Sequence, residues 1–269
     1  MDSVGTAHPG EAAVSDAEHR KRFARIEQFI GTEAMDRLEG SYAAVIGLGA
    51  IGSYATEALA RAGVGRLLLV DTDVVEYSNF NRQLYALEAN LGRPKAEAAV
   101  ERVLEINPAC GVRGLHRFVH KEDYPELFAD RPDIIIDAID SLNPKVELLV
   151  YAGQEKLDII SCLGAAIRTD PLKVRVDRFR KAQYCPLARQ IRRRLRRLGV
   201  GMDFPCVFSL EELTEEQRQT LGEYDETIEI GRPRRILGSL PTIPGIFGLT
   251  AANTAIRMLI DRDGPLVQP

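Results

Sequence analysis

Residues 42–52 read YAAVIGLGAIG and combine a short apolar run with a glycine-rich turn. The run 42–46 predicts a buried strand, and the Ala- and Leu-rich residues 53–62 predict a helix. Gly47, Gly49 and Gly52 have the spacing G-x-G-x-x-G. Between a strand and a helix, these glycines permit the turn, the approach of a phosphate and the packing of helix on strand. We therefore expect a nucleotide phosphate at the helix N-terminus; the alternative is a tight turn without a ligand.

Alternating strands and helices continue beyond this unit. The sequence predicts strands at 66–70, 112–119, 132–137 and 158–163, with helices at 95–106 and 144–156. This alternation predicts an α/β fold of the Rossmann-like, doubly wound kind, with a mostly parallel sheet covered on both faces. Ligands of such sheets bind at the carboxyl ends of the strands.

The pattern changes after residue 168. Residues 172–176 alternate and predict an antiparallel C-terminal extension of the sheet, 186–198 a basic helix, 211–229 an acidic loop and 245–260 an apolar closing helix. Because no linker interrupts the chain, we expect a flexible tail at 1–18 followed by a single domain at 19–269. Its nucleotide-binding core covers about 40–168 and its substrate-side extension about 169–269.

Composition narrows the function classes. The 269 residues carry a net charge of −4, so a nucleic-acid site would have to be a local basic patch. The 4 cysteines form no C-x-x-C pair, which argues against a zinc knuckle or a redox pair and suits a reducing cytoplasm. No apolar run reaches about 18 residues, so we expect no membrane span.

A polar cluster follows the second strand. It comprises Asp71, Asp73, Asn79, Arg82 and Gln83. Asp71 lies 19 residues after Gly52, close to the spacing of a ribose-binding carboxylate. The glycine motif alone suggests a nicotinamide dehydrogenase, but such an enzyme does not need so many polar side chains beside the ribose. A nucleotidyl-transfer site that binds ATP needs polar and charged side chains at this position.

Charged residues further along supply the remaining parts of such a site. Arg82 and Lys95 can neutralise a triphosphate, and Asp140 can hold Mg²⁺ where the strand at 132–137 ends. The alternatives are surface ion pairs for Arg82 and Lys95, and a helix cap for Asp140.

Taken in order, G-x-G-x-x-G, D-x-D-x-V-x-x-S-N-x-x-R-Q, G-x-P-K and D-x-x-D resemble the ubiquitin-activating-enzyme superfamily, which includes the ThiF and MoeB types. The resemblance covers roughly residues 22–260 and implies a homodimer. It implies that Asp71 binds ribose, that Arg82 and Lys95 bind phosphates, and that Asp140 organises Mg²⁺. It also implies that an N-terminal arginine, here best matched by Arg25, reaches the partner subunit's nucleotide.

Two departures distinguish the chain within this superfamily. It lacks the C-x-x-C pairs of the sulfur-carrier activators, and residues 231–241 contain no cysteine where many members carry a nucleophile. The motifs DAIDS at 137–141, CVFS at 206–209 and the Arg-rich helix at 186–198 resemble the tRNA threonylcarbamoyladenosine dehydratases. That resemblance implies ATP-dependent adenylation of a threonyl carboxylate and cyclisation by the neighbouring carbamoyl group, and it leaves a sulfur-transfer partner doubtful.

The Arg-rich helix carries a predicted tRNA surface. Leu187, Ile191, Leu195 and Leu198 are expected to form its apolar stripe, and the arginines to face outward. We expect Arg192, Arg193, Arg196 and Arg197 to bind the tRNA backbone. The alternative is a solvated face paired with the acidic run at 211–216. Rival functions are activation of a ubiquitin-like sulfur carrier and a non-enzymatic nucleotide-binding scaffold.

Overall fold

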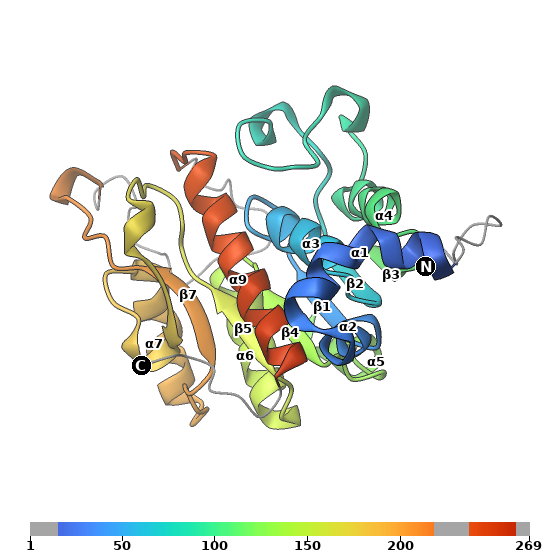
Figure 1. Cartoon of the computed structure of the whole chain (residues 1–269). Helices are drawn as coiled ribbons and strands as arrows, with labels where there is room; N and C mark the ends of the chain where they lie inside the picture. The colour runs from blue at the N-terminus through green and yellow to red at the C-terminus, as the bar shows by residue number, and fades with distance from the viewer. Residues whose placement is uncertain (1–15, 218–236, 262–269) are drawn as a thin grey trace.

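The computed structural model describes residues 16–217 and 237–261. These residues contain one seven-stranded sheet. Its strand order is β3-β2-β1-β4-β5-β7-β6 (Figure 1). The strands are β1 (Tyr42–Ile46), β2 (Arg66–Asp71), β3 (Gly111–His116), β4 (Ile134–Asp137), β5 (Ile159–Cys162), β6 (Val174–Arg178) and β7 (Pro205–Ser209). All neighbours pair in parallel except β6 and β7, which are antiparallel. The predicted α/β fold with an antiparallel C-terminal extension is therefore confirmed.

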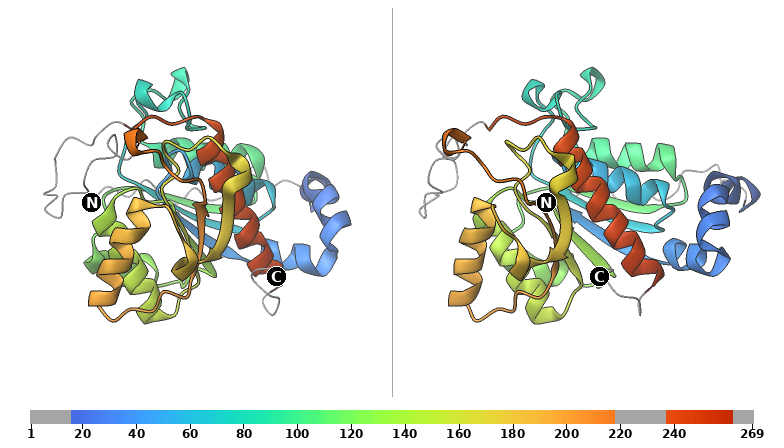
Figure 2. Two further views of the ribbon diagram at one scale, coloured as in Figure 1. Left: turned by 90° about the vertical axis from the view of Figure 1, so that its left-hand side faces the viewer. Right: turned by 60° about the vertical axis from the view of Figure 1, so that its left-hand side comes forward.

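Helices cover both faces of the sheet (Figures 1 and 2). They are α1 (Asp16–Ile30), α2 (Thr32–Glu39), α3 (Gly52–Arg61), α4 (Lys95–Ile106), α5 (Tyr124–Leu127), α6 (Leu142–Glu155), α7 (Pro186–Arg197) and α9 (Thr242–Ile260). Short 3₁₀ turns lie at η1 (Tyr77–Asn79), η2 (Glu88–Asn90), η3 (Lys121–Asp123), η4 (Pro171–Lys173) and η5 (Phe179–Lys181). The helices α3, α4 and α9 pack on one face, and α5, α6 and α7 pack on the other.

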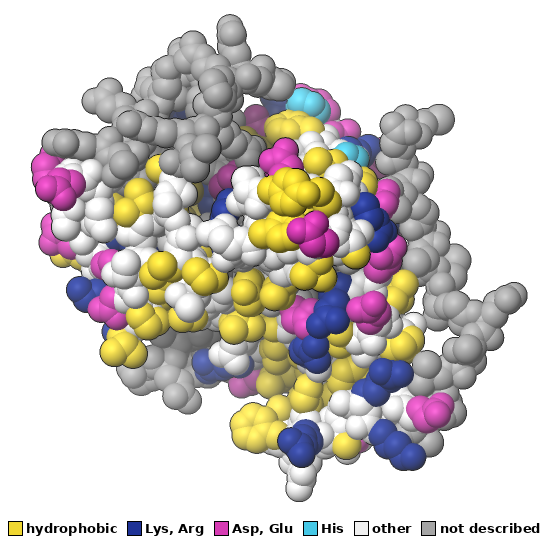
Figure 3. All heavy atoms as spheres, turned by 90° about the horizontal axis from the view of Figure 1, so that it is seen from above, with side chains coloured by type: hydrophobic (Ala, Val, Ile, Leu, Met, Phe, Trp, Pro, Cys, Tyr) yellow, Lys and Arg dark blue, Asp and Glu magenta, His cyan; other side chains and the backbone are white. Residues whose placement is uncertain are grey.

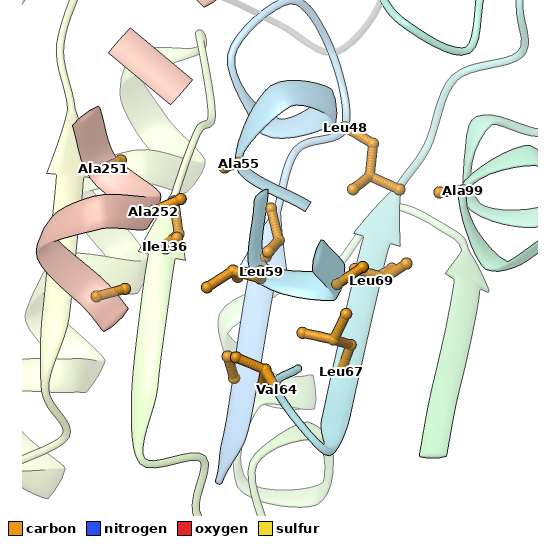
Figure 4. Packing of buried hydrophobic residues seen from close by; sticks show 14 of the residues in the cluster. Leu48, Ala55, Leu59, Val64, Leu67, Leu69, Ala99, Ile136, Ala251 and Ala252 are labelled. Carbon is orange, nitrogen blue, oxygen red and sulfur yellow. The ribbon is translucent and has the colours of Figure 1, made fainter. Parts of the chain in front are cut away.

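The strands are apolar on both sides because both sides are covered. In β1, Ala43 and Val45 join the cluster under α3 and α9, whereas Ala44 and Ile46 join the cluster under α6 and α7. Figure 4 shows the first cluster, in which Leu59 of α3 lies against the strands. This arrangement accounts for the continuous apolar runs that predicted a parallel sheet.

The predicted bounds agree with the structure where the pattern is strong and differ elsewhere. Strand β1 and helix α4 have the predicted bounds, whereas β3 ends at His116, before the predicted 119. Strand β7 was not predicted: its five residues begin with a proline and show no alternation, because every one of them is buried. Helix α1 begins at Asp16, inside the stretch expected to be a tail, and residues 1–15 lie outside the described part.

Helix α9 is long and apolar enough to cross a membrane by length and composition, with 19 residues and a mean hydropathy of 1.3. Its contacts are those of a core helix. It packs on α3 and on β4, β5, β6 and β7, and its side chains at Phe247, Ala251 and Ala255 are fully buried.

The packing of α9 on α3 generates a testable prediction. A Cβ atom on Gly248 would lie 2.3 Å from the Ile51 carbonyl oxygen and 2.9 Å from Tyr54 Cβ. Gly248→Ala should therefore force the helices apart and lower the free energy of unfolding by about 1–3 kcal/mol, measured by denaturant titration. Gly201→Ala is the matched control, since a Cβ atom there meets nothing within 4 Å. Equal stability of the two variants would contradict the tight α3–α9 contact.

Candidate nucleotide-binding site

The glycine loop lies between β1 and α3, at the edge where the parallel strands end. Gly47 N–H donates to the Val70 carbonyl at 2.8 Å and continues the pairing of β1 with β2. Gly47 has φ +93°, and a Cβ atom there would lie 2.8 Å from the Ala138 carbonyl oxygen. On Gly52, a Cβ atom would lie 1.8 Å from the Gly47 carbonyl oxygen. Both positions require glycine because backbone fills the space around them.

Gly49 differs from its two neighbours. The nearest atom to a Cβ built there is Gln83 Nε2, at 3.8 Å. Nothing in the described chain crowds Gly49, so the surface of the loop is open beside the Gln83 amide and the first turn of α3. A phosphate group can approach the backbone there.

Asp71 ties the glycine loop to the segment that follows β2. Its Oδ2 accepts from Leu48 N–H at 2.5 Å, and its Oδ1 accepts from Asp73 N–H at 2.8 Å. Burial raises the pKa of the Asp71 carboxyl above its ordinary value, and the Lys95 ammonium and these two N–H donors offset part of that rise. Each oxygen keeps a second lone pair that can accept from a ribose hydroxyl.

Lys95 is nearly buried at the start of α4, with 4% of its surface exposed. Its Nζ donates to Asp73 Oδ2 at 3.0 Å, and its backbone N–H donates to the Asp73 carbonyl at 3.0 Å. Residues 72–94, here called the 72–94 excursion, leave the sheet and return, and the bridge between Val74 and Pro94 closes their base. That closure places Lys95 beside Asp73 and close to Asp71, the last residue of β2.

The first part of the 72–94 excursion positions three of the predicted residues. Asn79 is buried, and its Oδ1 accepts from Glu76 N–H at 3.1 Å, so this amide fixes the turn η1. Arg82 Nη1 donates to the Ser78 carbonyl at 2.9 Å and to Asn81 Oδ1 at 2.7 Å. Gln83 follows and faces Gly49. The structure thus brings Gln83 to the glycine loop, whereas the side-chain hydrogen bonds of Asn79 and Arg82 stay within residues 76–82.

Seen from above, from the side of the 72–94 excursion, the described residues show hydrophobic side chains across the middle of the face (Figure 3). Lys and Arg side chains lie among Asp and Glu rather than in one group (Figure 3). Any concentrated basic surface of the described chain must therefore be sought elsewhere.

Asp140 lies on the loop between β4 and α6. It is exposed, and Ser141 Oγ donates to its Oδ1 at 3.1 Å. The N-cap position of α6 is Ser141, whose side chain makes no capping hydrogen bond, so Asp140 does not occupy the cap position considered for it. The same loop packs on the glycine loop, because the Ala138 carbonyl lies against Gly47.

Sequence reasoning assigned no role to Asp137 or Lys145, which form a fully buried ion pair below this loop. Lys145 Nζ lies 2.8 Å from Asp137 Oδ2, and both side chains are 0% exposed. The pattern carries a signal for such a pair: an acidic residue ends an otherwise apolar strand, and a lysine falls on the buried side of the next helix. His116, likewise without a predicted role, pairs in register with Asp71 at the end of β3.

The structure does not bring Arg25 to the glycine loop of its own chain. Arg25 is exposed on α1, and Phe23, two residues earlier, packs on Gly63. Gly63 follows α3 at the end remote from Gly52. If Arg25 contacts a nucleotide, that nucleotide is bound to another subunit.

The Arg-rich helix α7 corrects two expectations. Leu187, Ile191 and Leu195 are buried as predicted, but Leu198 is 59% exposed because α7 ends at Arg197 and Leu198 is its C-cap. Arg192 does not face outward: its Nη2 donates to the Ala182 carbonyl at 2.8 Å and its guanidinium lies 5.4 Å from the centre of the Phe179 ring.

The remaining α7 arginines fall into two groups. Arg194 is half-buried and donates to Asn143 Oδ1, which ties α7 to α6. The exposed ones are Arg189, Arg193, Arg196 and Arg197. Within residues 16–217 and 237–261, Arg196 and Arg197 make no ion pair. Glu211, which begins the acidic run, instead uses its carboxylate on Thr169 and Asp170 N–H, both at 2.9 Å.

Loops of the C-terminal extension meet beside the same edge of the sheet. The buried Arg168 donates to the carbonyls of Glu211 and Tyr184, and Ile167 N–H donates to the Gly238 carbonyl at 3.0 Å. Asn81 Nδ2 donates to the Ser239 carbonyl at 3.1 Å. The segment 237–240 therefore joins the 72–94 excursion to the extension. Residues 231–236 of the cysteine-free loop lie outside the described part.

Comparison with known proteins identifies a family model and relatives that match most of this chain. The model of the ThiF family matches residues 22–268. The tRNA threonylcarbamoyladenosine dehydratase of Bacillus subtilis is 35% identical over 242 residues, which are 89% of this chain and 94% of that protein. The Escherichia coli molybdopterin-synthase adenylyltransferase is 33% identical over 163 residues, 59% of this chain and 63% of that protein.

Solved structures of the Escherichia coli tRNA threonylcarbamoyladenosine dehydratase superpose on nearly the whole chain. Its complex with AMP gives a TM-score of 0.81 at 32% identity and covers 93% of this chain and 97% of that one. Its complex with ATP gives a TM-score of 0.80 at 31% identity, with 93% and 99% covered.

The different surroundings of the glycines generate a prediction. Gly49→Ala should leave the fold intact and weaken binding of a nucleoside triphosphate, because its methyl group would enter the open surface of the loop. Gly52→Ala should destabilise the fold, because its methyl group overlaps the Gly47 carbonyl. Thermal unfolding and titration calorimetry on both variants check this. A Gly49→Ala variant that binds the nucleotide as tightly as the unaltered protein would place the phosphates elsewhere.

Proposed function

The chain belongs to the ThiF family, and from that premise we propose that it is an ATP-dependent tRNA threonylcarbamoyladenosine dehydratase. It adenylates the carboxylate of the threonylcarbamoyl group and closes that group into a ring. The strongest support is the likeness to the Bacillus subtilis dehydratase over 94% of that protein's length. The likeness to the molybdopterin-synthase adenylyltransferase covers a smaller part of both chains, so activation of a sulfur carrier is the weaker alternative.

The reaction balances without an external nucleophile. A carboxylate oxygen attacks the α-phosphorus of ATP and pyrophosphate leaves, which gives an acyl adenylate. The carbamoyl group then attacks the activated carbonyl carbon and loses a proton, and AMP leaves with one former carboxylate oxygen. Because nucleophile and electrophile belong to one side chain, their effective concentration is high and the protein mainly has to position them.

The residues around the glycine loop suit ATP binding. Gly49 and the first turn of α3 leave room for phosphate, Gln83 lies beside that room, and Asp71 offers lone pairs to the ribose. Arg82 has further N–H donors besides those directed at Ser78 and Asn81. Lys95 can share its ammonium between Asp73 and a phosphate. These groups neutralise charge that develops on the triphosphate during adenylyl transfer.

A magnesium ion, bound with the triphosphate, would supply further charge neutralisation at this edge. Asp140 is the side chain that would hold it, with a carboxylate exposed beside the glycine loop. The described residues contain no cluster of three or more His, Cys, Asp or Glu side chains suited to a metal. The arrangement fits magnesium, which binds through one or two carboxylates together with substrate phosphates and waters.

The cysteines support chemistry without a protein thiol. All 4 cysteines of the sequence are buried. Burial raises the pKa of Cys110 and Cys162 to about 12 and also raises that of Cys206. A buried thiol that stays protonated is a poor nucleophile. A role in sulfur transfer therefore finds no support in these residues.

We assign ATP to the core at about 40–168 and the tRNA to the extension at about 169–269. The exposed arginines of α7 can contact backbone phosphates, and Arg192 is now better assigned to anchoring the helix. In a homodimer, Arg25 of one subunit would complete the nucleotide site of the other. A tRNA substrate places the protein in the cytoplasm.

Nucleoside analysis tests the function directly. Incubation of threonylcarbamoyladenosine-containing tRNA with the protein, ATP and Mg²⁺ should convert that nucleoside to one lighter by a water molecule, with AMP as coproduct. Asp140→Ala should keep the fold and lower the rate by roughly 10²-fold or more, because it removes a group that stabilises transition-state charge. Asp158→Ala is the control, because Asp158 is an exposed aspartate just before β5, at the end of the strand remote from the glycine loop. Normal turnover of Asp140→Ala at limiting Mg²⁺ would reduce Asp140 to a surface residue.

The α7 surface gives a second prediction for this function. Arg196→Gln with Arg197→Gln should weaken tRNA binding and make its salt dependence shallower, because fewer counterions are released. Binding of ATP and thermal stability should stay unchanged, since neither arginine has an ion-pair partner in the described part of the chain. Arg37→Gln with Arg61→Gln removes the same charge from α2 and α3, on the other side of the molecule (Figure 1). Equal tRNA affinity of the two double variants would rule out α7 as the docking surface.

A further inference from the structure

The buried ion pair of Asp137 and Lys145 directs its donors at the loop that carries Asp140. Besides its contact with Asp137 Oδ2, Lys145 Nζ donates to the Ile139 carbonyl at 2.9 Å and to the Asp137 carbonyl at 3.4 Å. Ser161 Oγ, on the neighbouring strand, donates to the same Asp137 Oδ2 at 2.7 Å. All the hydrogen bonds of the ammonium group therefore end on residues 137–139.

Stability alone does not account for a lysine at this position. The free energy needed to remove two charged groups from water is about as large as the free energy gained from their attraction. Apolar residues of similar volume therefore often stabilise a core equally well. A cation in the first turn of a helix is also unfavourable with respect to the helix dipole. Lys145 lies in the first turn of α6 with its side chain fully buried, so it meets both costs.

The loop held by Lys145 is fixed on its other side by the glycine loop. Ala138 N–H donates to the Ile46 carbonyl at 2.9 Å, and a Cβ atom on Gly47 would lie 2.8 Å from the Ala138 carbonyl oxygen. Residues 138 and 139 are thus held between the ammonium group and the backbone that faces the phosphates. We call this restraint of residues 138 and 139 the clamp. Asp140 is the next residue, and its side chain is exposed.

We propose that Lys145, together with Asp137 and Ser161, is a positioning residue that sets where the Asp140 carboxylate stands relative to the triphosphate. The proposal rests on the proposed function, because it assumes that Asp140 acts on magnesium-bound ATP. Lys145 itself contacts no substrate. Its effect is transmitted through the backbone of residues 137–139, and a displacement of about 1 Å at a reacting group can cost 10²-fold in rate.

The test uses the double variant Lys145→Met with Asp137→Asn in the full chain. It removes both charges together and leaves no unpaired buried charge, so the fold should persist. Hydrogen exchange of the Ala138 and Ile139 amides should accelerate about 10-fold or more, since the clamp no longer opposes local opening. The Mg²⁺ concentration needed for tight ATP binding should rise about 10-fold, and kcat for AMP formation should fall about 10²-fold. The KM for tRNA should remain unchanged.

A milder variant keeps the test decisive if the double variant does not fold. Ser161→Ala removes one hydrogen bond to Asp137. As a control, Ser41→Ala removes one hydrogen bond of a similarly buried serine, to the Arg37 carbonyl, just before β1. Only Ser161→Ala should raise the Mg²⁺ requirement, by a few-fold, and accelerate exchange at residues 138 and 139. This expectation follows from the position of Asp137 between Ser161 and Lys145.

Unchanged exchange and an unchanged Mg²⁺ requirement in a folded double variant, or identical behaviour of the two serine variants, would overturn the proposal. Both measurements use the protein and ATP without tRNA. They therefore judge the clamp separately from nucleoside analysis, which judges the proposed function.

Discussion

The contact between the glycine loop and the loop after β4 constrains the rest of the site. The Ala138 carbonyl occupies the place of a side chain on Gly47, and the Gly47 carbonyl occupies the place of a side chain on Gly52. Three backbone segments therefore meet without side chains between them, where the parallel strands β1 and β4 end. Because the loops are this close, residues 138 and 139 are held against the glycine loop, to which Asp71 is also bound through Leu48 N–H. The proposed action of Asp140 on the triphosphate depends on this contact, since separated loops would leave Asp140 farther from the phosphates.

The sequence patterns predicted the parts of the fold that depend on strong local signals. The apolar run of β1, the proline before α4 and the glycine spacing are local, and the structure has them as expected. Strand β7 escaped prediction because its burial comes from a sheet that closes over it, and Pro205–Ser209 carries no period of its own. The α7 stripe was extended one residue too far because a helical period cannot show that α7 stops at Arg197.

In the candidate site, too, local sequence patterns indicate some features, whereas others depend on tertiary contacts. Asp71, Arg82, Gln83, Lys95 and Asp140 are proposed as site residues from their order along the chain, since parallel strands bring their ends together. The contacts that these side chains make could not be predicted from that order. That Lys95 faces Asp73, or that Arg192 packs on Phe179, depends on tertiary contacts. The Asp137–Lys145 pair is the clearest case, because the pattern places each residue on a buried surface but cannot show that the two side chains meet.

In the proposed reaction, ATP, the substrate and the protein have separate parts. The core holds ATP, the substrate brings its own nucleophile, and the buried cysteines take no part. The chain is acidic overall, yet α7, which belongs to the extension, carries four exposed arginines. In the proposed scheme the core binds ATP, the exposed α7 arginines bind the tRNA backbone, and adenylation of the threonyl carboxylate connects the two.

Isotope transfer tests that connection most directly. The tRNA substrate would be prepared with ¹⁸O in the threonyl carboxylate, and the nucleotide product of a single turnover would be examined by mass spectrometry. Adenylation followed by ring closure predicts one ¹⁸O atom in AMP for each cyclised nucleoside, because AMP leaves with a former carboxylate oxygen. Label found in inorganic phosphate together with ADP, or AMP without label, would contradict the account.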